Sequence, residues 1–171
     1  SLDMIRPGGR MAIVLPQGRF NNSSDKTIRD FIAEHCRILA VVGLHGNTFK
    51  PHTGTKTSIL FVQKWDDEFC PRKNDYNIFF ATQRKAGKDN SGEKIYIKNK
   101  AYVAPTKKGN MVAEKYEEYI AVLQTQNAFL LDSYGHKIVD HDLFNTDGLT
   151  QDGIAEAFAE FAKKEKLSFF A

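Results

Sequence analysis

The stretch from 46 to 56 contains the side chains best suited to bind a polyanion or a planar base. It combines one aromatic ring with basic side chains and with glycine, proline and threonine, residue types that form loops. An aromatic face offers a base a stacking surface, and basic side chains can meet phosphate groups. The residues that we expect to contact such a ligand are Phe49, by stacking, and Lys50, His52, Thr53 and Lys56 beside it.

Each of these expectations has a plainer structural alternative. Phe49 could fold back into the core beneath its loop, and a lone lysine is usually only solvated. The backbone N–H groups of residues 53–55 could bind an anion or simply shape the turn. A second polar loop, 17–22, follows the first apolar run, and there Gln17 and Arg19 could face the same ligand.

Other kinds of chemistry find little support in the sequence. His136, Asp140, His141 and Asp142 are closely spaced and could ligate a metal ion, but no second cluster with ligand spacing accompanies them, so we expect no metal site. The sequence has no Gly-x-Ser-x-Gly elbow and no phosphate-binding Gly-x-x-x-x-Gly-Lys loop. Hydrolase and NTPase chemistry are therefore disfavoured.

Two apolar runs must position the loop, one on each side of it. Residues 38–44 and 57–64 are rich in β-formers and are predicted to be buried strands. The connection between them, about twelve residues without helical character, is too short for a parallel crossover, so we expect antiparallel pairing. The run 11–15, closed by Pro16, is typical of a strand covered on both faces in a mostly parallel sheet. The loop after it would then lie where open α/β sheets bind ligands.

The remaining elements follow from helical or alternating patterns of apolar residues. A helix is predicted to begin at a Ser23 or Ser24 cap, with Asp25 in its first turn, and to end near Cys36. After the strand at 57–64 come a strand at 76–81, an edge strand at 94–97, a loop at 98–112, a helix at 113–126, an irregular stretch at 127–148 and a last helix at 150–166, capped by Thr150.

Composition indicates a globular protein with a modest positive charge. Of 171 residues, 42% are hydrophobic and 26% charged, and the net charge is +3. Basic residues dominate between 82 and 110 and acidic residues between 111 and 171, which suits two different partners or, equally well, two solvated surfaces. The two cysteines form no framework, and no apolar run approaches the roughly 20 residues that span a bilayer. We expect a cytoplasmic protein.

Four motifs stand in an order that carries a family resemblance. They are 8–18 (GGRMAIVLPQG), 41–44 (VVGL), Phe49 and 53–60 (TGTKTSIL), with a predicted helix between the first two. Together they resemble the C-terminal part of the catalytic domain of N6-adenine DNA methyltransferases, most closely the modification (M) subunit of type I restriction-modification systems. Residues 76–97 and the last helix are similar to the extension that follows that domain.

The resemblance implies an α/β fold: part of the Rossmann-like sheet of an S-adenosylmethionine-dependent methyltransferase, with an antiparallel last strand, followed by a mixed β-hairpin and helical extension. It divides the chain into 1–66, the C-terminal part of the catalytic domain, 67–112, a β-rich basic extension, and 113–171, a helical acidic tail. It further implies methyl transfer from S-adenosylmethionine to an adenine flipped out of double-stranded DNA, with Phe49 stacked on that base. The specificity and restriction subunits of a type I complex would be partners.

Two motifs of that family are absent from the chain. It contains no Asn-Pro-Pro or Asp-Pro-Pro, and Gly8-Gly9 forms an ordinary turn, not a glycine-rich cofactor loop. We therefore expect no catalytic residue here, no methylation by this piece alone, and cofactor binding in a longer protein. A partial sheet would leave an open edge through which the piece could dimerise. The alternative function is a non-catalytic DNA-binding or subunit-assembly module that uses the basic stretch for DNA.

Overall fold

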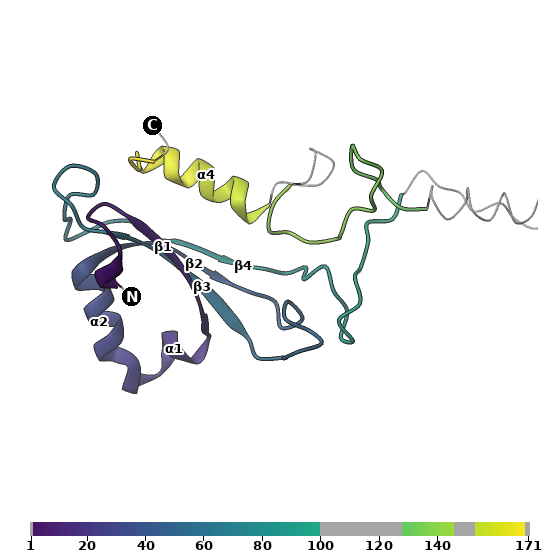
Figure 1. Cartoon of the computed structure of the whole chain (residues 1–171), viewed down its shortest axis with the longest axis horizontal. Helices are drawn as coiled ribbons and strands as arrows, with labels where there is room; N and C mark the ends of the chain where they lie inside the picture. Colours follow the sequence, from purple (N-terminus) through teal and green to yellow (C-terminus); the bar gives the residue numbers. More distant parts are fainter. Residues whose placement is uncertain (1, 100–127, 146–152, 170–171) are drawn as a thin grey trace, which may run out of the picture.

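The computed structural model describes residues 2–99, 128–145 and 153–169, and every statement below concerns these ranges. A small mixed sheet lies between helices (Figure 1). The elements in chain order are η1 (Leu2–Met4), β1 (Arg10–Pro16), α1 (Gly18–Asn21), η2 (Ser23–Asp25), α2 (Lys26–His35), β2 (Cys36–Gly43), β3 (Thr57–Lys64), β4 (Phe79–Thr82) and α4 (Ile154–Lys164).

The sheet has the strand order β1-β3-β2-β4. Strand β3 runs antiparallel to both β1 and β2, and β4 runs parallel to β2, so β1, β2 and β4 point in the same direction. The predicted antiparallel pairing of the two strands that flank the loop is confirmed. A short connection without a helix can only reverse the direction of the chain, so β3 runs antiparallel to β2. Since β3 also pairs antiparallel with β1, it lies between two strands, β1 and β2, that are parallel to each other.

The two faces of the sheet are covered by different helices: α1 and α2 lie on one face and α4 on the other (Figure 1). Side chains of β3 alternate between them as strand geometry requires. Leu60 and Val62 are buried in the core on the α2 face, whereas Phe61 packs on the α4 face against a core that includes Leu39 and Ala162. The sheet is thus a central layer with an apolar core on each side.

Strand β1 differs from the prediction for residues 11–15. It is an edge strand paired with β3, and its residues alternate between exposed and half-buried. Met11 and Ile13 pack into the α2-face core, but Val14, on the other face, is 47% exposed. The expectation that this strand is covered on both faces is therefore wrong for the described residues. The reason is that the aromatic side chains of α4 pack over β3 and β4 and leave the end of β1 uncovered.

Several predicted element ends are also corrected. The loop at 17–22 contains one helical turn, α1, and the helix after it begins at Lys26 without any side-chain cap from Ser23 or Ser24. Asp25 is at the N-cap position but makes no capping hydrogen bond, because its carboxylate pairs with an arginine side chain. The last helix, α4, begins at Ile154, and there the Glu156 carboxylate accepts a hydrogen bond from the Gly153 N–H at 2.8 Å.

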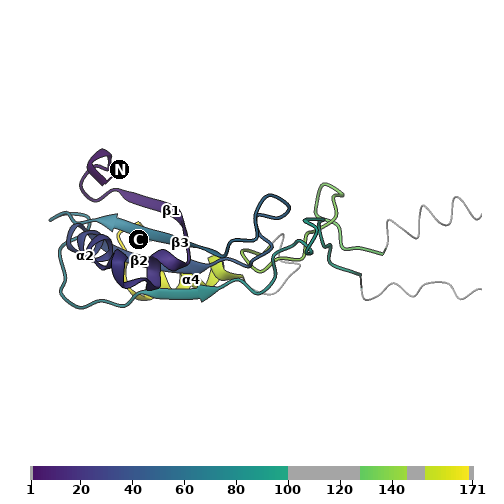
Figure 2. The same ribbon diagram turned by 90° about the horizontal axis from the view of Figure 1, so that it is seen from below.

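Parts of 83–99 and 128–145 form a narrow arm that extends beyond the end of the sheet in both views (Figure 2). Isolated bridges join 88 to 94, 96 to 139, 98 to 129 and 131 to 137, so the predicted edge strand at 94–97 is present as single bridges only. The predicted helix 113–126 and the Thr150 cap lie outside the described residues. The division at 66 and 112 remains a prediction, although α4 packs on the same sheet as the strands before 66.

Candidate functional site

Three segments meet at one end of the sheet, namely those that follow β1, β2 and β4. Because β1, β2 and β4 are parallel, their carboxyl ends lie on the same edge, where open α/β sheets bind ligands. Backbone hydrogen bonds join the loops there: the Gln17 N–H donates to the Lys56 carbonyl at 3.0 Å, and the Gln83 N–H donates to the Gly43 carbonyl at 2.8 Å. The structure thus brings Gln17 next to the 44–56 loop.

The predicted ligand-contacting residues lie on the outside of this loop. Phe49 is 38% exposed and belongs to neither core cluster, so it is not a residue of the core. His52, Thr53 and Lys56 are exposed, and Lys50 is half-buried. The loop therefore presents one aromatic face with basic side chains nearby, which is the chemical combination that binds nucleic-acid bases and backbones.

Residues 53–55 mainly shape the turn. The Thr53 N–H donates to the Phe49 carbonyl at 3.1 Å, and the Thr55 N–H donates to the Thr53 hydroxyl at 3.1 Å. The Lys50 N–H likewise donates to the Asn47 carbonyl at 3.1 Å. Two of the backbone donors considered for anion binding are therefore already used within the loop, which leaves contacts to a ligand chiefly to the side chains.

A segment 40 residues further along the chain supports the loop from outside. The Lys88 ammonium donates to the carbonyls of Thr48 at 3.2 Å and Lys50 at 3.0 Å. The Asn47 amide in turn donates to the Lys88 carbonyl at 3.3 Å. Gln83 is only 3% exposed, and its side-chain oxygen accepts from the Thr48 hydroxyl at 2.9 Å. Sequence reasoning missed these supports, because no periodicity or spacing marks them.

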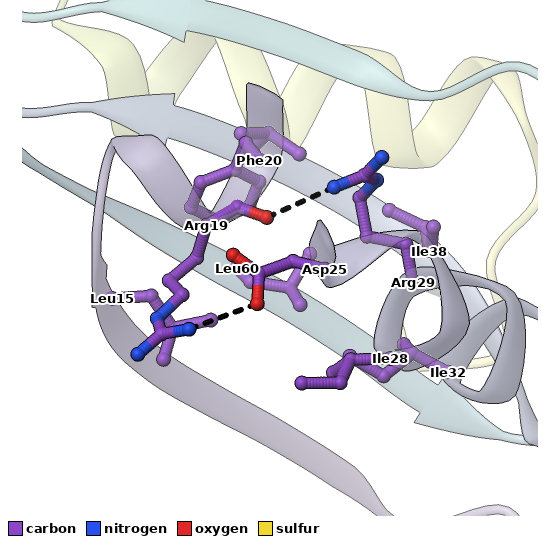
Figure 3. A pocket seen from close by; sticks show the side chains of 10 residues that line it. Leu15, Arg19, Phe20, Asp25, Ile28, Arg29, Ile32, Ile38 and Leu60 are labelled. Atoms are coloured by element: carbon purple, nitrogen blue, oxygen red, sulfur yellow. Dashed lines mark hydrogen bonds and ion pairs between the residues drawn. The ribbon is translucent and has the colours of Figure 1, made fainter. Parts of the chain in front are cut away.

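Arg19 is not part of this loop cluster. Its guanidinium pairs with the buried Asp25 carboxylate at 2.8 Å, on the α2 face of the sheet (Figure 3). Arg29 donates to the Arg19 and Asn22 carbonyls at 3.3 and 2.7 Å and so fixes the backbone of the same turn. That either residue faces a ligand stays a prediction; the structure places Gln17 beside the 44–56 loop and Arg19 against Asp25.

A mainly apolar cavity of about 220 Å³ lies beside the Arg19–Asp25 pair. One Asp25 carboxylate oxygen, Oδ2, has no hydrogen-bond partner. The walls come from β1, α1, α2, β2 and β3, and no residue of the 44–56 loop lines it (Figure 3); the lining residues are Leu15, Arg19, Phe20, Asp25, Ile28, Arg29, Ile32, Ile38, Val41 and Leu60.

Part of the predicted basic surface is neutralised by the acidic tail. Lys85 pairs with Asp140 at 2.9 Å, and the backbone N–H groups of Arg84 and Lys85 donate to the Asp142 carboxylate at 2.8 and 3.3 Å. The Asp140 and Asp142 side chains, considered above as metal ligands, thus join the segment before α4 to the residues directly after β4. In the described ranges, no group of three or more His, Cys, Asp or Glu residues is arranged to bind a metal ion. No helix of these ranges is long and apolar enough to cross a membrane.

The two cysteines lie in the packed interior near the start of β2. Both Cys36 and Cys70 are buried and free. Burial raises the pKa of each thiol above its ordinary value of 9.0, which lowers the fraction of reactive thiolate at neutral pH. Neither is therefore a candidate nucleophile.

Comparison with known proteins agrees with the resemblance seen in the motifs. The model of the family described as N-6 DNA Methylase matches residues 1–132. The chain belongs to the N-6 DNA methylase family. A curated relative, the methylase subunit of the type I restriction enzyme EcoEI from Escherichia coli, is 38% identical over 64 residues, which cover 37% of this chain and 13% of that subunit. The present chain thus matches only a small part of that methylase subunit.

Two solved structures show weaker likenesses. One, from Listeria monocytogenes, is described as a class I S-adenosylmethionine-dependent methyltransferase and is 23% identical, with 47% of this chain and 24% of that chain covered and a TM-score of 0.41. The other, from Vibrio vulnificus, is described as a modification subunit of a type I restriction enzyme and is 18% identical, with 79% and 28% covered and a TM-score of 0.35. Membership of the N-6 DNA methylase family is carried by the family match alone.

Proposed function

We propose that this chain forms the target-base side of the active site of a DNA adenine-N6 methyltransferase, as part of the modification subunit of a type I restriction-modification system. In that protein S-adenosylmethionine supplies the methyl group, and DNA together with specificity and restriction subunits are the partners. The observation that carries the proposal is the exposed ring of Phe49, on a loop fixed at the carboxyl end of the parallel strands.

The adenine amine is inaccessible inside a stacked duplex, so a methyltransferase for it must extrude the base. An extruded base loses its stacking neighbours and needs a replacement surface. Phe49 offers such a surface, and Lys50, His52 and Lys56 can meet the phosphates of the strand that is pulled outward. Gln17, bonded to the backbone of Lys56, lies beside the same loop.

The test is replacement of Phe49 in the full-length methyltransferase assembled with its specificity subunit. The assay measures transfer of tritiated methyl groups from S-adenosylmethionine to plasmid DNA that lacks adenine methylation. Phe49→Ala should lower kcat/KM about 5- to 150-fold, because stacking on an aromatic ring contributes about 1–3 kcal/mol per base. Phe49→Trp, which keeps an aromatic face, should keep most of the activity.

A matched control is Tyr134→Ala, which removes another exposed aromatic ring, 85% exposed, at the turn of the arm. It should leave methyl transfer close to the wild-type rate. Equal rates for Phe49→Ala and the wild type would contradict the proposal. The chain on its own should show no binding heat when titrated with S-adenosylmethionine, since we assign the methyl donor's site to the remainder of the methyltransferase.

A further inference from the structure

The backbone on both sides of Phe49 is tied to one side chain from a distant segment. The Lys88 ammonium donates to the carbonyl of Thr48 at 3.2 Å and to that of Lys50 at 3.0 Å, the residues directly before and after Phe49. Hydrogen bonds from a charged donor contribute more than neutral ones. Lys88 is half-buried, so water weakens these bonds less than it would at a fully exposed site.

Gln83 fixes the start of the same loop. Its side-chain oxygen accepts from the His45 N–H at 3.1 Å and from the Thr48 hydroxyl at 2.9 Å, while its side-chain nitrogen donates to the Lys85 carbonyl at 2.9 Å. The residue directly follows β4 and is buried. The loop is therefore anchored to the end of the sheet through an amide side chain that makes three hydrogen bonds.

The turn at 89–93 packs against the far side of the loop. Gly92 has φ +99°, and a Cβ atom there would lie 2.7 Å from Pro51 Cδ and 2.9 Å from the Lys50 backbone carbon. The contact is close enough that only glycine fits without a shift of the loop. The segment 83–92 thus holds the loop at its start, beside Phe49 and at Pro51.

This support matters because neither core cluster holds the ring. Phe49 is 38% exposed and lies outside both clusters, so the order of the backbone that carries it contributes to the position of the ring. A ring on a loose loop would lose conformational freedom each time a base stacked on it, and this loss would weaken stacking. A loop that is ordered in advance avoids it.

We propose that Lys88 and Gln83 are positioning residues that hold the Phe49 loop ready to receive the extruded base. The inference rests on the proposed function, since it assigns a role to the loop's order in base stacking. It also changes the interpretation of the basic stretch at 82–110: Lys88 acts on the protein backbone and not on DNA phosphates.

The test is a double-mutant cycle in the full-length methyltransferase with its specificity subunit, using the tritiated methyl assay on unmethylated plasmid DNA. Lys88→Met keeps the aliphatic stem and removes the donors. It should lower kcat about tenfold, less than the ~100-fold that misplacement of a reacting group can produce. In the Phe49→Ala background the same change should lower kcat by less than about twofold, because residues that act as a unit are not additive.

Two further measurements separate positioning from general stability. Amide hydrogen exchange at 45–53 should speed up in Lys88→Met and in Gln83→Met, while the amides of β3 keep their wild-type rates. The control is Lys73→Met, the same change at an exposed lysine of the connector before β4, which should alter neither the exchange of the loop nor the rate.

The outcomes distinguish the inference from the function on which it rests. If Phe49→Ala loses no activity, both the proposed function and the positioning role are contradicted. A loss in Phe49→Ala together with an equal effect of Lys88→Met in both backgrounds overturns the positioning role alone and shows that Lys88 acts elsewhere, for example on a phosphate. Wild-type activity in Lys88→Met also overturns it, whereas a non-additive cycle with faster loop exchange supports it.

Discussion

The 44–56 loop and the cavity on the α2 face are two regions in which a cation fixes a turn, yet they present different surfaces. At the loop, Lys88 binds backbone carbonyls and leaves an aromatic ring exposed. At the cavity, Arg19 pairs with a buried carboxylate, and Arg29 binds the carbonyls of the turn, beside walls that are mainly apolar. In the first region the hydrogen bonds from Lys88 order a loop that carries an exposed ring, whereas in the second the ion pair and hydrogen bonds of the arginines lie at the margin of an apolar core.

This difference predicts separate consequences of mutation. The stability of the sheet depends on the apolar side chains that cover its faces, since burial of apolar area is the main favourable term in folding. The 44–56 loop contributes no residue to either core cluster, so a change there should alter function more than global stability. A substitution in the cavity should therefore change stability without changing methyl transfer, and a substitution in the support of the loop should do the reverse.

The largest effect on stability is expected for Leu60→Ala. Leu60 is 4% exposed on β3 and lines the cavity, so truncation enlarges an existing space. The expected loss in free energy of unfolding, measured by urea denaturation, is about 2–5 kcal/mol. Methyl transfer per folded molecule should stay within about twofold of the wild type, because the 44–56 loop does not line this cavity. A drop in methyl transfer per folded molecule well beyond twofold would show that the two regions are coupled.

An intermediate effect is expected for Gly92→Ala. The new Cβ would meet Pro51 and the Lys50 backbone and push the loop away from its support, on top of the roughly 1–2 kcal/mol that a positive φ costs a non-glycine residue. Methyl transfer should fall about tenfold or more. Gly135→Ala is the matched control, with φ +80° and no atom within 4 Å of the added Cβ, so it carries the backbone strain alone. Equal rates in the two variants would argue against the loop contact.

Much of the sheet could be predicted from the sequence. The apolar runs at 38–44 and 57–64 gave strands within a few residues of β2 and β3, and the short link between them required the antiparallel pairing that is observed. Local signals of this kind work because the period of apolar residues and the length of a connection act within a short stretch of chain.

The support of the site could not be predicted in the same way. Lys88 contacts Thr48 and Lys50 across some 40 residues, and nothing in the sequence distinguishes it from the other lysines at 82–110. Arg19 likewise turns to Asp25 because a one-turn helix, α1, replaces the expected loop. Pairings between polar side chains depend on tertiary geometry, which a pattern of residue types does not encode.

The smallest effect, and the finest test of the loop's support, concerns the Asp89 carboxylate. It accepts hydrogen bonds from the Ser91 hydroxyl at 2.7 Å and from the backbone N–H groups of Ser91, Gly92 and Glu93 at 2.9–3.0 Å. The Ser91 hydroxyl first, and then these N–H groups, lower the pKa of Asp89 below its ordinary value of 3.8. A carboxylate with a lowered pKa stabilises the folded turn above pH 3.8, and this contribution is lost as the pH falls through the lower, folded value.

An NMR titration of the Gly92 and Glu93 amides from pH 6 to pH 2 should therefore show a transition with a midpoint below 3.8. Asp89→Asn removes the titrating group, so its amide shifts should lack this step. If the 89–93 turn holds the loop through Gly92, the Lys50 amide should shift with the same midpoint in the wild type and stay flat in Asp89→Asn. A Gly92 step without a Lys50 step would show that the turn titrates alone, and would leave Lys88 and Gln83 as the contacts that order the ring.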